Sequence, residues 1–444
     1  MQKFPYPSVF LFYVYIYLMI AIKNTNGICF LLLGIFALAC PAAHAQVLTE
    51  EKPPSHIRSI VFKGDGENGN GQFPVIRAGD LFTLSFDDLN ASESDYYYRI
   101  VHCNYDWTPS DLLRSQYLKG MDNQRILNYR NSVTTLQPYS HYELTLPNTR
   151  TGLKLSGNYV LSIYNNRDEL QFSRRFVVYK EQVLVGAVIK RSRELPVIDK
   201  KQVVQFTIRN NGTPLVNPRQ EVKVVILQNY NWNTAITGLK PQFHSGNELI
   251  YKYDKETTFD GGNEYNYFDN KEIRASTNTI AGTEMRDLYH THLFTQTVQE
   301  GKPYTYNPDI NGDFRVRTTD GNARDSDTEA DYADVHFSLE YSSEIGLNEV
   351  YVYGKFNNYE LDEDNRMSLN DRNGRLEATI RLKQGFYNYK YVMKGPDGVD
   401  YTYINGNHFE TENNYLILVY YRNFGDTYDS LIGMGSASSV NISN

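Results

Sequence analysis

The chain has 444 residues, of which 44 are basic and 52 acidic, and a formal net charge of −8. This charge disfavours a nucleic acid or an anionic lipid surface as its main ligand. Tyr is unusually frequent, with 37 residues, and Tyr suits half-buried strand surfaces and partly wet contact surfaces.

Residues 1–45 differ from the rest of the chain because they carry Lys3 and Lys23 but no acidic residue. An apolar run of roughly residues 28–40 follows Lys23 and ends in PAAHA. A positive residue, a short apolar core and a small-x-small site are typical of a signal peptide. We therefore expect residues 1–45 to be a signal peptide that is cleaved after Ala45.

Three features of this leader leave alternatives open. Met19 would give a leader of ordinary length if translation starts there. An uncleaved N-terminal anchor is one alternative to cleavage. The sequence ALAC, which ends at Cys40, resembles a weak lipoprotein signal.

Cleavage removes Lys3 and Lys23, which leaves 42 basic residues against 52 acidic ones and a net charge of −10. Cys103 is then the one remaining Cys, so we expect no internal disulfide. We interpret Cys103 as a small buried apolar residue rather than a nucleophile. The mature chain has no apolar run long enough for a transmembrane helix.

Alternating apolar and polar residues, typical of β-strands, recur along the chain, and Asn-Gly and Asp-Gly turn signals separate them. The clearest alternating segments are 97–107, 159–163, 172–178, 204–208, 222–226, 335–341, 376–382 and 387–393. Short strands separated by such turns predict an all-β, multidomain protein of immunoglobulin-like β-sandwiches. We expect one short helix, within residues 111–118.

The pattern divides the mature chain into segments with different properties. An acidic stretch, TTDGNARDSDTEAD, lacks apolar periodicity and is typical of a linker. We expect an N-terminal sandwich at 55–180, a middle β domain at 182–317, an acidic linker at 318–330, a C-terminal sandwich at 331–430 and a flexible tail at 431–444.

Few residues suggest metal or catalytic chemistry. The acidic linker could bind calcium but lacks the spacing of an EF-hand loop. His290 and His292 would share one face of a strand, yet no third zinc ligand is near in sequence. His102 and Cys103 are adjacent on a strand and should point to opposite faces. We expect no cofactor, no metal and no enzyme activity, and we keep a hydrolase with spatially paired carboxylates as an alternative.

Residues 350–359, VYVYGKFNNY, predict a strand that leads into a tight aromatic turn. With the strands after it, this segment resembles early-set immunoglobulin-like modules that bind α-glucans, such as glycogen-binding modules. The resemblance implies Phe356, Asn358 and Tyr359 as carbohydrate contacts, although Tyr359 stands where those modules carry Trp. A secreted carbohydrate-binding protein is therefore an alternative function. The competing interpretation is that the turn packs against its own sandwich.

Residues 101–148 begin VHCNYDWTPSDLLRSQYLKG and have an unusual composition. Together with residues 156–159, 175–179, 246–249, 270–278 and 420–433, they resemble the plug protein family of the Bacteroidetes type IX secretion system. The resemblance covers nearly the whole mature chain.

This resemblance implies a non-enzymatic periplasmic protein that binds the periplasmic end of a giant outer-membrane β-barrel translocon. It would seal the pore when no cargo is present, and no small-molecule ligand is implied. We expect Tyr105, Asp106, Trp107 and Pro109 to lie at or beside the contact surface. The alternative is that Tyr105 and Trp107 fill the core of the first sandwich.

Overall fold

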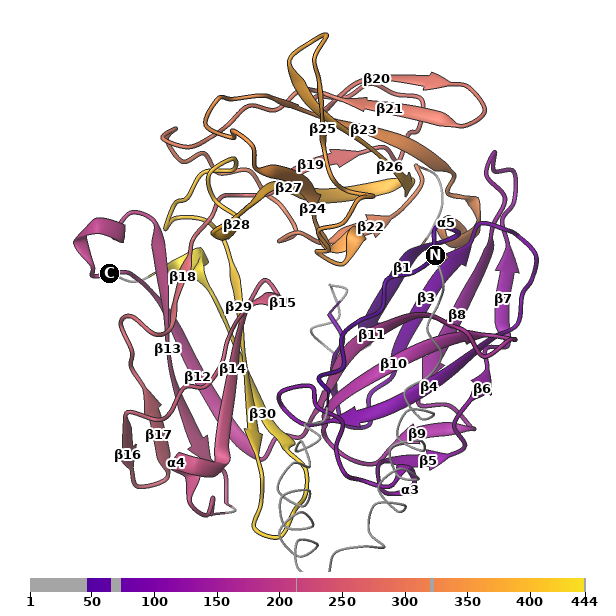
Figure 1. Cartoon of the computed structure of the whole chain (residues 1–444). Coiled ribbons are helices and arrows are strands. Elements are labelled where there is room, and N and C mark those ends of the chain that lie inside the picture. The colour runs from indigo at the N-terminus through magenta and orange to yellow at the C-terminus, as the bar shows by residue number, and fades with distance from the viewer. Residues whose placement is uncertain (1–45, 65–72, 213, 320–322, 443–444) are drawn as a thin grey trace, which may run out of the picture. The chain divides into compact units, whose positions relative to one another are not determined.

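Almost all regular structure in the described residues is β-strand, as the alternating pattern predicts (Figure 1). The computed structural model describes residues 46–64, 73–212, 214–319 and 323–442. The predicted signal peptide lies outside these residues. Val47–Asn444 forms one compact unit, in which six larger sheets of the described residues pair into three sandwiches.

The first sandwich contains one sheet with the strand order β1-β3-β8-β7 and a second with the order β2-β11-β10-β4-β6. Its core is rich in aromatic rings, because alternate residues of each strand, such as Phe82, Leu84 and Phe86 of β3, point between the sheets. A small extra sheet joins β5 to β9. The elements are β1 Ile57–Gly64, β2 Val75–Arg77, β3 Phe82–Asp88, β4 Tyr96–Cys103, α3 Arg114–Tyr117, β5 Leu118–Gly120, β6 Gln124–Arg125, β7 Asn128–Asn131, β8 Ser140–Leu146, β9 Thr151–Leu153, β10 Gly157–Asn165 and β11 Leu170–Tyr179.

The second sandwich is formed by two stretches of chain that are far apart in sequence. One sheet has the order β12-β13-β17-β16, with β18 also paired to β13, and the other has the order β15-β14-β29-β30. In Figure 1, the yellow strands β29 and β30 complete a sheet begun by the magenta strand β14. The elements are β12 Val183–Arg191, η2 Leu195–Val197, β13 Lys201–Asn210, α4 Pro218–Glu221, β14 Val222–Gln228, β15 Asn231–Ile236, β16 Phe243–Ser245, β17 Glu248–Tyr251, β18 Thr258–Asp260, β29 Asn414–Tyr421, β30 Ser430–Ser438 and η4 Ser439–Asn441.

The third sandwich is inserted between β18 and β29. Its first sheet places β27 between β19 and β22, with β24 and β28 also paired to β27, and its second has the order β20-β21-β23-β26-β25. The elements are β19 Asn266–Asp269, β20 Ile280–Met285, β21 Tyr289–Leu293, β22 Phe314–Val316, α5 Ala323–Glu329, β23 Tyr332–Glu340, β24 Glu349–Tyr353, η3 Lys355–Asn357, β25 Ser368–Asn370, β26 Arg375–Lys383, β27 Gly385–Gly395 and β28 Gly398–Asp400.

These sheets differ from the boundaries expected after residue 180. Residues 266–317 belong to the third sandwich, because β19 and β22 both pair with β27. The stretch expected to be a linker contains α5, and its neighbour Asp331 is buried. Its carboxylate accepts hydrogen bonds from the amides of Leu136 (2.7 Å) and Gln137 (3.3 Å), and a local pattern of charges does not reveal partners so distant in sequence.

The segment expected to be a flexible tail begins with the buried strand β30. Its glycines make the sequence look weakly structured, yet they permit close packing. A Cβ on Gly433 would lie 2.4 Å from a methyl group of Val183, and one on Gly435 would lie 2.5 Å from a methyl group of Val185. These two glycines therefore let β30 approach β12 more closely than larger residues could.

Candidate functional site

The stretch 101–111 ends β4 and forms a tight turn at the contact between the first and second sandwiches. In β4, Tyr98 and Ile100 point into the first core, so Val101 and Cys103 point outward. The turn closes through hydrogen bonds from the Trp107 amide to the Asn104 carbonyl (3.0 Å) and from the Asn104 amide to the Thr108 carbonyl (2.8 Å).

A separate apolar cluster joins the two sandwiches. Trp107 packs edge to face on Trp232, with ring centroids 4.9 Å apart, and the Arg175 guanidinium lies 4.5 Å from the Trp107 ring centroid. This contact contains both Trp residues of the protein. The buried members of the cluster are Cys103, Trp107, Val160, Val177, Tyr179, Val225, Leu227, Leu416, Leu418, Tyr420 and Leu431.

Hydrogen bonds surround this apolar cluster. The Tyr420 hydroxyl donates to Asn158 Oδ1 (2.7 Å), and the Tyr105 amide donates to Asp429 Oδ2 (3.3 Å). Lys223 and Arg422 also bind the Asp429 carboxylate, at 2.8 and 3.0 Å. The second sandwich therefore holds the Tyr105 turn by both apolar and polar contacts.

The predicted contact residues thus have different environments. Trp107 is only 5 % exposed, so its indole could lie beside an outer contact surface but not form part of one. Trp107 also lies outside the core of the first sandwich. The alternative interpretation, that Trp107 fills this core, is therefore wrong. Tyr105 and Pro109 are half-buried, and Asp106 is exposed.

His102 and Cys103 do not form a catalytic pair. His102 Nδ1 lies 2.9 Å from the Ser110 hydroxyl, while the Cys103 thiol belongs to the apolar cluster between the sandwiches. Burial lowers the pKa of His102 to about 4 and raises that of Cys103 to about 12. Both groups are therefore neutral near pH 7, which agrees with a packing role for Cys103.

A buried cluster of charges joins the first and third sandwiches. Lys383 Nζ of β26 lies 2.6 Å from Asp87 Oδ2 of β3, and the Tyr332 hydroxyl of β23 donates to the same oxygen (2.7 Å). His141 Nδ1 of β8 lies 2.6 Å from Asp87 Oδ1. Lys383 Nζ also donates to the Asp327 carbonyl of α5 (2.7 Å).

Asp87 is ionised at the centre of this cluster. Burial alone would raise the pKa of Asp87, but the positive charge of Lys383 and the hydrogen bond to His141 outweigh burial and hold the pKa below its ordinary value. Removing one partner of such a buried pair leaves an uncompensated charge and costs about 3–5 kcal/mol. Sequence reasoning missed this cluster, because Asp87 and Lys383 are 296 residues apart.

The residues implied as carbohydrate contacts are used inside the protein. Tyr359 is buried, and its ring centroid lies 5.0 Å from that of Tyr353. Phe356 packs edge to face on Tyr387, which belongs to the core of the third sandwich. Asn358 Nδ2 donates to Glu50 Oε2 (2.6 Å). The aromatic turn therefore packs against its own sandwich, and Tyr359 offers no exposed ring for a sugar to stack on.

The structure adds a third imidazole to the two predicted to share a strand face. His336 Nε2 of β23 lies 3.0 Å from His290 Nδ1, and the His336 ring stacks on His292 with centroids 4.3 Å apart. Burial, together with His292 and His290, lowers the pKa of His336 to about 4. In this arrangement two of the ring nitrogens bind each other rather than converging on a common point.

Glu264 is buried and Asp309 half-buried, and the pKa values of both carboxyl groups are raised, as a hydrolase would need. Burial is the main cause for both residues. Glu264 accepts hydrogen bonds from the Tyr304 hydroxyl (2.5 Å) and the Glu412 amide (3.1 Å). Asp309 accepts them from the amides of Tyr265 (2.5 Å) and Asn311 (2.7 Å). These bonds give both carboxylates a role in holding loops of the chain.

The connection between β4 and β8 exposes large apolar side chains. Leu113 is 72 % exposed and Met121 is 67 % exposed. Leu127, Val133 and Leu136 on the same connection are also exposed. Single exposed apolar residues are common on protein surfaces, so it is their number within residues 113–136 that makes this connection a candidate contact region.

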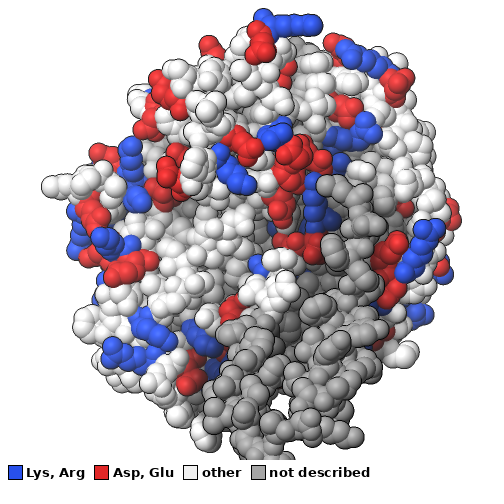
Figure 2. Space-filling view, viewed as in Figure 1, with Lys and Arg blue, Asp and Glu red and all other residues white. Residues whose placement is uncertain are grey.

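Charged residues of both signs are interspersed over the face shown in Figure 2, around a broad uncharged area. This distribution agrees with a protein partner rather than a polyanion. None of the described helices combines the length and apolar character that a bilayer crossing requires.

Comparisons with known proteins agree with this architecture. The family model for the first domain of type 9 secretion system plug proteins matches residues 57–180. A crystal structure of a hypothetical protein from Parabacteroides merdae ATCC 43184 is similar, with a TM-score of 0.84 and 31 % sequence identity. The similarity covers 88 % of this chain and 100 % of that chain. No curated protein matches. The chain belongs to the plug protein family of the type 9 secretion system.

Proposed function

We propose that this protein is a periplasmic plug that binds the periplasmic end of the outer-membrane β-barrel translocon and seals its pore when no cargo is present. The observation that carries the proposal is the family match over the first sandwich. Family membership points to a role in type 9 secretion, to association with the translocon and to a structural rather than enzymatic role.

The contacts among the sandwiches support this role physically. A plug must cover a wide opening without deforming under the solutes and cargo that press on it. The apolar cluster around Trp107 joins the first and second sandwiches, and the charged cluster around Asp87 joins the first and third. Two buried junctions of this kind oppose relative motion of the three sandwiches.

We assign the translocon contact to the connection between β4 and β8. This connection lies in the domain that matches the family, and it exposes the side chains of Leu113, Met121 and Leu127. Asp106 lies in the preceding turn. It is the exposed residue among the four expected contact residues, Tyr105, Asp106, Trp107 and Pro109. A modest apolar contact with a polar rim suits a plug, because it must release when cargo arrives.

A pull-down from detergent-solubilised outer membrane tests this assignment. The tagged wild-type protein is expected to recover a very large barrel protein. A double variant, Leu113→Asp with Met121→Asp, should recover much less of it, because two buried charges oppose docking. Leu195→Asp is the matched control, since Leu195 is 81 % exposed but belongs to the second sandwich. If the double variant and the wild type recover equal amounts of the barrel protein, the translocon does not contact this connection.

Outer-membrane permeability tests the sealing role separately. A strain that lacks the protein should take up more of a large antibiotic, and the wild-type gene should restore the barrier. Unchanged uptake in the deletion strain would contradict pore sealing even if the pull-down succeeds. N-terminal sequencing of the periplasmic protein tests export, with Gln46 expected as the first residue.

A further inference from the structure

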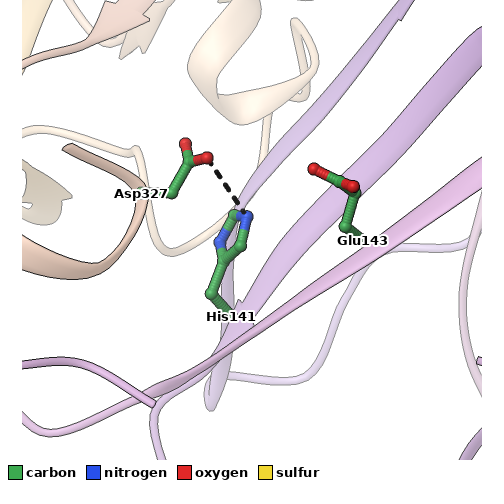
Figure 3. Close-up of side chains that lie close together, drawn as sticks. All are labelled: His141, Glu143 and Asp327. Atoms are coloured by element: carbon green, nitrogen blue, oxygen red, sulfur yellow. Dashed lines mark ion pairs between the residues drawn. The ribbon is translucent and has the colours of Figure 1, made fainter. Parts of the chain in front are cut away.

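Three potential metal ligands meet where α5 approaches β8 of the β1-β3-β8-β7 sheet. His141 and Glu143 lie two residues apart on β8, so their side chains share the face opposite the first core. Asp327 approaches from α5. One ligand atom of each residue lies within 4.8 Å of the others, and Figure 3 shows the three side chains directed toward one another.

The hydrogen bonding of His141 leaves its Nε2 pointing into this group without a hydrogen-bond partner. Asp87 is ionised and can only accept, so His141 Nδ1 must donate the 2.6 Å hydrogen bond between them. In the singly protonated ring, this hydrogen bond leaves the lone pair on Nε2. The His141 side chain is 7 % exposed, and Nε2 has no hydrogen-bond partner. A buried ring nitrogen without a partner is unfavourable, which favours a group that pairs with it.

The groups facing Nε2 are also acceptors. Asp327 Oδ2 lies 3.9 Å from Nε2, and the Glu143 carboxylate completes the group. Converging acceptors favour a positive charge between them, and Arg130 already supplies one to Asp327 from 3.3 Å. A carboxylate that fixes an imidazole through Nδ1 while Nε2 stays free is the arrangement that orients histidine ligands in metal sites.

We propose that His141, Glu143 and Asp327 bind a divalent transition-metal ion, with Zn²⁺ as the best match, and that Asp87 positions the imidazole. One imidazole nitrogen and two carboxylate oxygens suit Zn²⁺, with water as a fourth ligand. Glu143 already accepts from Asn128 (2.8 Å) and Asp327 from Arg130 (3.3 Å). The Asp327 oxygen nearest Nε2, Oδ2, is the one that accepts from Arg130, and a carboxylate oxygen has two lone pairs, so it can keep this donor while it binds the ion.

The charges around the site also allow a cation. Lys383 balances Asp87 at 2.6 Å, and Arg130 offsets one of the two remaining carboxylates. One negative charge of the Glu143 and Asp327 pair therefore remains unbalanced and would attract the ion. Because β8 belongs to the first sandwich and α5 leads into β23 of the third, a bound ion would strengthen the junction between them. This role goes beyond pore sealing and does not depend on it.

Zinc binding by the purified chain from Gln46 tests the site. After treatment with a chelator, the protein is titrated with ZnCl₂ by calorimetry, and its thermal unfolding is followed with and without zinc. Glu143→Gln and Asp327→Asn should each weaken zinc binding at least about tenfold, as even outer-shell changes do. Zinc should raise the Tm of the wild type but not of these variants.

Two matched controls separate this site from others. Glu248→Gln changes another half-buried strand glutamate, and His292→Ala removes an imidazole from the second histidine group. Both variants should keep the zinc affinity of the site. The proposal is overturned if the wild type binds no zinc, or if Glu143→Gln and Asp327→Asn leave binding unchanged. It is also overturned if His141 proves doubly protonated at neutral pH by NMR and zinc does not displace that proton.

Discussion

Replacing Lys383 with Met tests the buried charge cluster between the first and third sandwiches. Lys383 and Asp87 are 1 % and 0 % exposed, and their charged atoms lie 2.6 Å apart. Met keeps most of the side-chain volume but leaves the Asp87 carboxylate buried without its cation. Such a loss costs about 3–5 kcal/mol. We expect about 3 kcal/mol, because His141 and Tyr332 still donate to Asp87.

Urea denaturation followed by circular dichroism measures this loss. Glu248→Gln is the control, because it removes the pair with Arg209, whose side chain is 61 % exposed. An exposed pair contributes no more than about 1 kcal/mol. The double variant Asp87→Asn with Lys383→Met should lie closer to the wild type than Lys383→Met alone, since no buried charge remains unpaired. A Lys383→Met variant as stable as the control would refute the reasoning.

Three further predictions concern Asp87, Trp107 and Cys103. The lowered pKa of Asp87 contributes stability that is fully present above the unfolded pKa of about 3.9 and is lost as pH falls through the folded pKa. The wild type should therefore lose stability steeply below about pH 4, and an equally steep loss in Asp87→Asn would contradict this. Trp107→Ala should cost about 3–5 kcal/mol in urea denaturation, while Trp107→Phe should cost much less. Equal stability of the two variants would contradict a packed indole between the sandwiches. The Cys103 thiol, whose pKa burial raises to about 12, should resist a thiol reagent at pH 8 until urea unfolds the protein, and rapid labelling of the native protein would count against its burial.

The sequence was sufficient to predict the all-β sandwich class. The alternation in 172–178, 335–341, 376–382 and 387–393 corresponds to β11, β23, β26 and β27. These strands could be predicted because one face of each packs on a core, which imposes a period of two on the residues. The predicted short helix within 111–118 is the single turn α3.

The connectivity of the sandwiches could not be predicted in the same way. β14 pairs with β29, which matches Val222 with Tyr421 across the inserted third sandwich. Each of these strands has a strand pattern of its own, and alternation does not say which partner a strand takes. An insertion therefore leaves no mark in the periodicity on either side of it.

The candidate sites depend on the same long-range pairing. The 101–111 stretch stands out in the sequence, but its apolar face packs on a second sandwich that alternation alone does not place there. His141 and Glu143 have the spacing of any strand pair, and Asp327 is one acid among several in an acidic stretch. Only the fold brings α5 over β8 and turns these three ordinary residues into a possible site.

The central claim is that this protein binds the outer-membrane translocon as its plug. The most direct measurement is a tagged pull-down from detergent-solubilised outer membrane, with mass spectrometry of the recovered proteins. We predict recovery of a very large β-barrel protein in near-equal amount to the bait. Absence of such a protein, under conditions in which other translocon components stay associated, would contradict the claim.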